Sequence, residues 1–154
     1  MSLQNSESPS WCRGADRLAA TWQDFLLLAA RVLIGWIFLS SGFGKLMNIS
    51  AFAATMPRRG LPEFLGYIAP FVEFFGGAFL VAGLATRYTA LLMLLFMLFA
   101  TFSSHRYWSY PEAQQANQNS HFWKNVAITG GIVLLFITGA GRYALDAMLG
   151  RRRS

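Results

Sequence analysis

Residues 25–47 read FLLLAARVLIGWIFLSSGFGKLM, a run of 23 residues in which only Arg31 and Lys45 carry charge. The hydrocarbon core of a bilayer is about 30 Å thick, and a helix that rises 1.5 Å per residue needs about 20 apolar residues to cross it. This run is therefore long enough to span a membrane. The whole chain agrees, because 55% of its 154 residues are hydrophobic and 13% are charged, against about 25% charged residues in an ordinary soluble domain.

Three further apolar runs follow, and each reaches spanning length, the last two only with short extensions. They are residues 65–85 (LGYIAPFVEFFGGAFLVAGLA), residues 88–102 (YTALLMLLFMLFATF, extended through residues 87 and 103–104) and residues 126–140 (VAITGGIVLLFITGA, extended back to residue 122). The second and third runs are separated by two residues only, which predicts a tight antiparallel hairpin. We predict an all-α membrane protein, an antiparallel bundle of four transmembrane helices over residues 25–146. A polar tail (residues 1–24) precedes it and a basic tail (residues 147–154) follows it.

Orientation is predicted from the basic residues, which concentrate on the cytoplasmic side. Four spans place both termini and the second connection on one side, and that side holds eight of the 13 Lys and Arg residues. We therefore expect both termini in the cytoplasm, with the first run acting as an uncleaved anchor because no apolar signal core precedes it. The terminal Arg151, Arg152 and Arg153 either contact anionic lipid or only fix this topology. The net charge of +6 flanks the apolar runs instead of lining a polar face, which argues against nucleic-acid binding.

Small residues on the runs are expected to let the helices approach closely, since close packing and interhelical hydrogen bonds drive association in lipid. Ser40 and Gly44 stand four residues apart on the first run. Gly76 and Gly77 leave part of the second run without side chains. The third run lacks such a face and is expected to contact lipid or a partner protein.

Three charged residues lie within the spans, and such residues tend to face the bundle interior and to be paired. By helical rise, Lys45 lies about 3 Å, Glu73 about 12 Å and Arg31 about 24 Å below the outer surface. We expect an intramembrane network of Arg31, Lys45 and Glu73, with Lys45 as the nearer partner of Glu73 and Arg31 reaching toward the cytoplasm. Two interpretations stay open: the charges join the first two helices, or Glu73 binds a proton or a ligand in an outward-facing cavity.

The connection at residues 105–121 is polar and rich in aromatic residues, and it is expected at the outer interface. Its aromatic residues form either an interfacial belt or a site for a planar, quinone-like ring. The ligand-site hypothesis combines the pair Lys45 and Glu73 with a set from the connection and the start of the fourth run: His105, Trp108, His121 and Trp123.

Other chemistries find less support in the residues. Two histidines without carboxylate or thiolate companions predict no metal site, and Cys12 as the single cysteine excludes an internal disulfide or a CxxC pair. No hydrolase, P-loop or dinucleotide motif occurs, so the sequence leaves open whether the chain is an enzyme.

Several motifs resemble the DoxX family of small bacterial inner-membrane proteins, in particular its YphA-type members. They are GFGK at residues 42–45 after Arg31, GLATR at residues 83–87 after Glu73, HRYW at residues 105–108, and FWKNVAI at residues 122–128, which continues through TGAG at 138–141 to Leu145 and Asp146. The resemblance implies a multi-pass protein of the bacterial inner membrane with both termini cytoplasmic. It also implies a membrane subunit or partner in a quinone-linked or thiol and oxidative-stress redox system, with a quinone as the cofactor and a redox protein or a second copy as the partner.

Two other functions compete with this one. The chain could be a non-enzymatic membrane scaffold or assembly factor, because fold does not determine function. It could also be a small transporter in which Glu73 couples transport to a proton, because carboxylates inside membranes often mark such paths.

Overall fold

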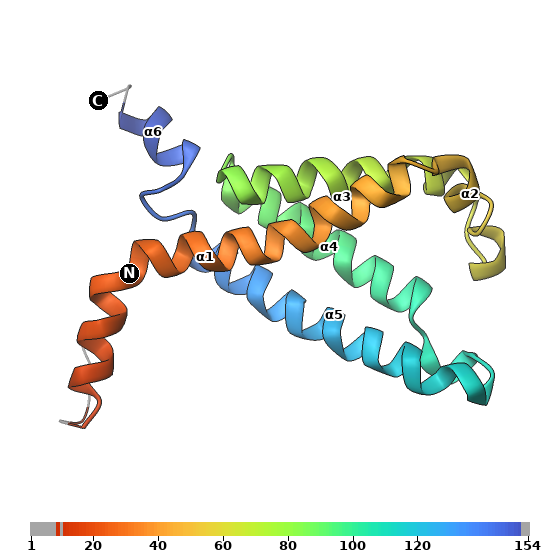
Figure 1. Cartoon of the computed structure of the whole chain (residues 1–154), viewed down its shortest axis with the longest axis horizontal. Coiled ribbons are helices and arrows are strands. Elements are labelled where there is room, and N and C mark those ends of the chain that lie inside the picture. The colour runs from red at the N-terminus through yellow and green to blue at the C-terminus, as the bar shows by residue number, and fades with distance from the viewer. Residues whose placement is uncertain (1–8, 10, 152–154) are drawn as a thin grey trace.

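The computed structural model describes residue 9 and residues 11–151, and these form a bundle of helices (Figure 1). Arg152 and Arg153 lie outside the described residues. The helices are α1 (Arg13–Leu46), α2 (Ile49–Ala53), α3 (Phe64–Ala82), α4 (Thr86–Ser104), α5 (Glu112–Thr138) and α6 (Leu145–Arg151), with short 3-10 turns at η1 (Pro57–Arg59) and η2 (Tyr107–Ser109). By length and composition, α1, α3, α4 and α5 can each cross a membrane. The predicted four-helix architecture is thus confirmed.

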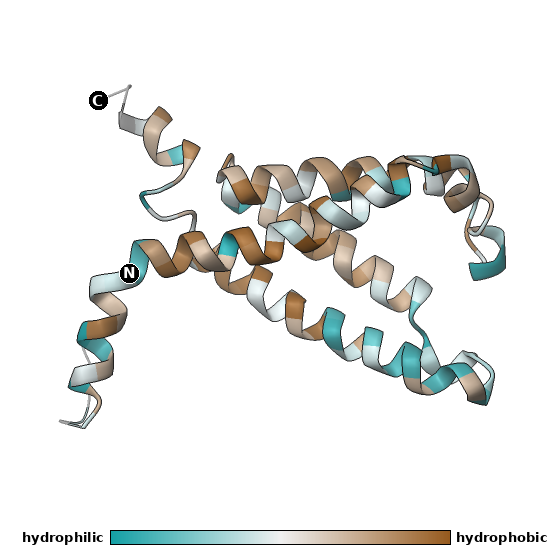
Figure 2. Cartoon of the chain, in the orientation of Figure 1, coloured by the Kyte–Doolittle hydropathy of each residue, from teal (hydrophilic) through white to brown (hydrophobic). Residues whose placement is uncertain are grey.

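Two helices begin earlier than their apolar runs. α1 begins at Arg13, so about half of the predicted polar tail is helical, and Figure 1 shows this part bending away from the rest of the helix. α5 begins at Glu112, so the second half of the predicted 105–121 connection is also helical. Polarity alone suggested a loop there, but Ala, Gln and Glu are good helix formers. Figure 2 shows the polar first half of α5 followed by an apolar second half.

The predicted hairpin between the second and third runs is a three-residue turn. α3 ends at Ala82, and the next residue, Gly83, has a left-handed φ of 69°; an added Cβ there would collide with the guanidinium of Arg31. Glycine is therefore required at this position both for its backbone conformation and for space. Asp146 completes the turn, because its carboxylate accepts hydrogen bonds from the backbone N–H groups of Ala85 (2.6 Å) and Thr86 (2.8 Å) at the start of α4.

Helices α1 and α3 pack so closely that only glycine, which has no Cβ, fits at several of their contact positions. A Cβ at Gly77 on α3 would collide with the backbone of Leu39, and a Cβ at Gly42 on α1 would lie 2.5 Å from the backbone nitrogen of Phe74. Gly76 faces Met93 on α4 instead. The expected contact at Gly44 is wrong, since a Cβ there would meet nothing within 4 Å. Close approach therefore runs through Gly35, Gly42 and Gly77.

The bundle consists of two tightly packed pairs, α1 with α3 and α4 with α5, which contact each other less extensively. A buried cluster joins the pairs, with Phe38, Leu80, Met93, Ile132 and Leu135 at its centre. Figure 1 shows α5 diverging from α1 and α3 toward the end that carries α2. We call this end, where α1 finishes and α3 begins, the α2 end; it is the end predicted to face outward.

Candidate functional site

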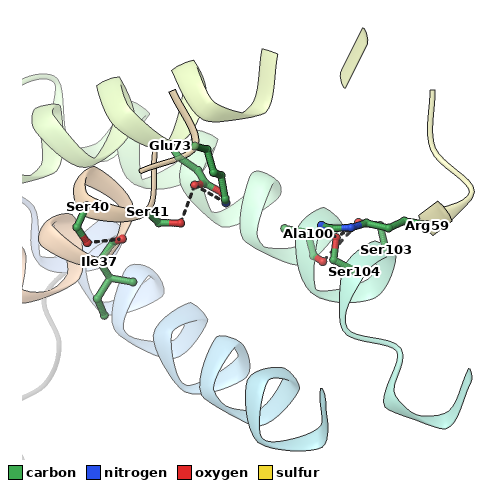
Figure 3. A network of polar contacts seen from close by, with 9 residues as sticks. Ile37, Ser40, Ser41, Arg59, Glu73, Ala100, Ser103 and Ser104 are labelled. Atoms are coloured by element: carbon green, nitrogen blue, oxygen red, sulfur yellow. Dashed lines mark hydrogen bonds and ion pairs between the residues drawn. The ribbon is translucent and has the colours of Figure 1, made fainter. Parts of the chain in front are cut away.

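An ion pair joins α1 to α3 near the α2 end. The Nζ atom of Lys45 lies 2.5 Å from Oε1 and 2.7 Å from Oε2 of Glu73, and Ser41, one helical turn before Lys45, donates to Oε2 at 3.0 Å. Figure 3 shows Ser41 directed at Glu73 from the neighbouring helix. The Glu73 side chain is 9% exposed and that of Lys45 is 28% exposed. Glu73 is therefore a buried, fully bonded carboxylate, and Lys45 keeps partial access to its surroundings.

A second basic residue, Arg59, lies at the same end of the bundle and contacts α4. Arg59, in η1, donates to Oγ of Ser104 at the end of α4 (3.0 Å), as Figure 3 shows. Both cations contact the Phe52 ring of α2, with Lys45 Nζ 5.0 Å and the Arg59 guanidinium carbon 5.7 Å from its centroid. These distances allow cation–π attraction between the ring and each of the two cations.

The two histidines lie side by side at the junction of α4 and α5. Their ring centroids are 5.3 Å apart and the rings are nearly parallel. Nδ1 of His105 bonds the side chain of Gln118 (2.8 Å), and Nδ1 of His121 lies 3.0 Å from Nζ of Lys124. Because an ammonium can only donate, Nδ1 of His121 is the acceptor in this contact, and Nε2 is the ring nitrogen left to donate to a ligand.

These groups surround one cavity of about 370 Å³ between the two helix pairs. Its lining includes Glu73, Lys45 and Ser41 from α1 and α3, and His105, His121 and Lys124 from the α4–α5 side. Apolar residues such as Phe96, Met97 and Ile128 complete the lining. Asn125, 9% exposed, also lines it from α5. Three basic side chains (Lys45, Arg59 and Lys124) and one carboxylate line this space, which favours a ligand with acceptor oxygens.

The structure brings four of the six predicted ligand-site residues together: Lys45, Glu73, His105 and His121. It places Trp108 and Trp123 elsewhere. Trp108 is 55% exposed and packs edge-on against Phe122 with centroids 5.8 Å apart, and Trp123 is 58% exposed. Trp123 follows Phe122 on a continuous helix, so it projects away from the face that carries His121 and Asn125.

Arg31 does not join the pair of Lys45 and Glu73. Its side chain is 1% exposed and Nη2 donates to the backbone carbonyl of Tyr143 at 2.6 Å. The guanidinium is directed toward the end opposite the α2 end, where it lies beside Gly83, and the segment between α5 and α6 covers it there. Within the described residues, Nε and Nη1 of Arg31 and Oγ1 of Thr86 have no hydrogen-bond partner. The intramembrane charges thus divide into the ion pair of Lys45 and Glu73 at one end and, at the other, a buried guanidinium that bonds a backbone carbonyl.

Sequence reasoning missed several cavity residues. Ser41 stands four positions before Lys45, and Lys124 and Asn125 stand three and four positions after His121, so helical spacing alone places each on a shared face. Arg59 was missed because its position depends on the path of the connection between α1 and α3. Among residues 9 and 11–151, no three His, Cys, Asp or Glu side chains lie close enough to share a metal ion.

Comparisons with known proteins show the family of the chain and agree with a membrane setting. A protein-family model described as DoxX matches residues 26–106. The chain is 32% identical over 130 residues to the inner membrane protein YqjF of Escherichia coli, covering 84% of this chain and 96% of the relative. It is 34% identical over 123 residues to the inner membrane protein YphA of the same organism, covering 79% and 88%.

A shorter match is to a protein whose name refers to an oxidoreductase. Over 68 residues, which cover 44% of this chain and 51% of the relative, the chain is 34% identical to a Bacillus subtilis protein named "Putative oxidoreductase CatD". No solved structure matches the chain.

Proposed function

The chain belongs to the DoxX family and is a multi-pass protein of the inner membrane, and from this premise we propose that it binds the head group of a membrane quinone as the membrane subunit or partner of a redox system. The observation that carries the proposal is the single cavity that joins the buried pair of Lys45 and Glu73 to His105 and His121. The redox name of the partial relative from Bacillus subtilis gives independent support.

The cavity fits a quinone head group in size and in chemistry. Its volume of about 370 Å³ lies within the range of about 300–1,000 Å³ that is usual for small-molecule pockets. A quinone presents a planar apolar ring with a carbonyl oxygen at each end, and this cavity has hydrogen-bond donors from both helix pairs as well as apolar side chains. Ile37 (44% exposed) and Phe99 (52% exposed) line the cavity from the surface of the bundle, so a prenyl tail could leave directly into lipid.

The chain's own residues would bind and orient the head group. Nε2 of His121 can donate to one carbonyl oxygen, and the Lys45 ammonium, which has three N–H groups and one partner carboxylate, can donate to the other. Because the chain has a single cysteine, Cys12, it contains no dithiol pair to supply electrons. The proposal therefore assigns electron supply to a partner protein.

Scaffolding remains the second candidate, because the ion pair also joins α1 to α3. Loss of Glu73 would weaken the fold under either function, since removing one member of a buried pair leaves the other charge unpaired. The decisive variants are therefore cavity residues outside that pair.

The test is equilibrium binding of short-chain ubiquinone and menaquinone analogues to the purified protein in detergent. We expect binding by the parent chain and at least tenfold weaker binding by Asn125→Leu, because a buried polar wall of the cavity becomes apolar. The matched control is Asn117→Leu, the same substitution at an exposed position of the same helix, which should bind like the parent. Absence of binding to any quinone analogue, or equal binding by Asn125→Leu, would overturn the proposal.

A further inference from the structure

A second cavity, which shares no lining residue with the candidate quinone site, lies between α1 and α5. It has a volume of about 370 Å³ and is lined almost wholly by apolar side chains, including Leu26, Ala30 and Ile34 of α1 and Leu134 of α5. We call it the α1–α5 groove. Leu26 is 51% exposed and Leu134 is 63% exposed, so the groove is open to the surroundings of the bundle. Within the span of a membrane protein, those surroundings are hydrocarbon.

The volume of the groove matches one acyl chain. A methylene group occupies about as much space as a water molecule, about 30 Å³, so the groove holds about twelve of them. This volume therefore fits a single acyl chain of a lipid.

The groove ends beside two arginines. Its polar end carries Gln23 of α1 and Thr138 of α5. Arg142 lies next to Gln23, because its backbone N–H and its Nε atom contact the carboxylate of Asp24 at 2.9 and 3.5 Å. Arg87 lies next to Thr138, where its Nη2 donates weakly to the carbonyl of Ile137 at 3.4 Å.

Both guanidiniums are exposed and have N–H groups beyond those in their present contacts. The Arg142 side chain is 61% exposed and contacts the Asp24 carboxylate through Nε and the Tyr143 hydroxyl through Nη2, and Arg87 is exposed. Each guanidinium has five N–H donors, and phosphate oxygens are preferred partners of arginine. The polar end of the α1–α5 groove thus has two arginines beside it, while the rest of the groove is apolar.

We propose that the α1–α5 groove binds one anionic phospholipid, with an acyl chain between α1 and α5 and the phosphate at Arg87 and Arg142. The site differs from the predicted lipid contact at Arg151, Arg152 and Arg153, and it is independent of the proposed quinone site.

Native mass spectrometry of the purified protein with phosphatidylglycerol or phosphatidylcholine tests the assignment. The parent chain should retain one phosphatidylglycerol in preference to phosphatidylcholine. Arg142→Gln and Arg87→Gln should each weaken phosphatidylglycerol binding about fivefold, which corresponds to about 1 kcal/mol per arginine. Arg17→Gln removes an exposed arginine of α1 that lies six residues before Gln23, outside the contacts that place Arg87 and Arg142 at the polar end of the groove, and it should change nothing.

A second pair of variants tests whether an acyl chain occupies the α1–α5 groove. Ala30→Phe fills the groove and should weaken both lipids, whereas Leu33→Phe, at a position 70% exposed on the same helix and outside the groove, should weaken neither. Equal binding of the two lipids by the parent, or an equal effect of Arg17→Gln, would overturn the proposal. Dissociation of a protein oligomer by Ala30→Phe would also overturn it, because the occupant would then be a second copy.

Discussion

Replacing Glu73 by glutamine should destabilise the bundle by about 3 kcal/mol, because the ammonium of Lys45 then remains at the membrane-embedded end of α1 without its carboxylate. Breaking a buried pair costs about 3–5 kcal/mol. The lower figure applies because the Lys45 side chain, 28% exposed, can turn partly toward the interface. In a chain of this size the change corresponds to a fall in Tm of about 6–12 °C.

Thermal unfolding in detergent, followed by circular dichroism, measures this effect. Lys45→Met alone should be similarly harmful, because it leaves the carboxylate of Glu73 buried with only the hydroxyl of Ser41 as a partner. The double variant Lys45→Met with Glu73→Leu should recover most of the loss, since apolar replacement of a whole buried pair is often neutral. The coupling energy between the two sites then isolates the pair.

Ser41→Ala is the calibration for this cycle, because it removes one hydrogen bond to the carboxylate and should cost about 1 kcal/mol. If Glu73→Gln and Lys45→Met each unfold within 1 °C of the parent (a shift of about 0.5 kcal/mol or less), or if their effects simply add in the double variant, the reasoning about a buried and mutually dependent pair is refuted.

Three further predictions concern packing, capping and topology. Gly77→Ala should unfold at a markedly lower temperature than the parent, because its Cβ collides with the α1 backbone, whereas Gly44→Ala, in open space, should be neutral or slightly stabilising; equal Tm values would contradict the packing. Asp146→Asn should cost about 1 kcal/mol by weakening the N-terminal hydrogen bonds of α4, as measured by thermal unfolding, and no change would show that the contact carries no stability. Reporter enzymes fused to either terminus should report a cytoplasmic location, and a periplasmic signal from either fusion would refute the orientation predicted from the arginine distribution.

The number and type of the long helices could be predicted from the sequence because apolar length is a direct consequence of bilayer thickness. Their true starts could not, because α1 and α5 extend beyond the apolar runs into polar segments. Hydropathy identifies the part of a helix in lipid, whereas the part outside lipid depends on helix propensity and on contacts such as the one between Asp24 and Arg142.

The candidate site was predictable in part. Glu73 and Lys45 were found because charges inside a span are costly and need partners. The tryptophans at positions 108 and 123 were misplaced because aromatic character at an interface says nothing about which face of a helix carries it. Arg31 was assigned to the wrong neighbours, since its partner, the Tyr143 carbonyl, lies 112 residues away in a segment whose fold no local pattern specifies.

Ligand protection of a thiol in the cavity tests the account most directly. In a background where Cys12 is replaced by alanine, Ser103→Cys places a thiol on the cavity wall, and Ser120→Cys places one at an exposed site of α5. The account predicts that a short-chain ubiquinone analogue slows alkylation of the thiol at position 103 severalfold and leaves that at position 120 unchanged. Equal alkylation rates at position 103 with and without a saturating quinone would contradict it.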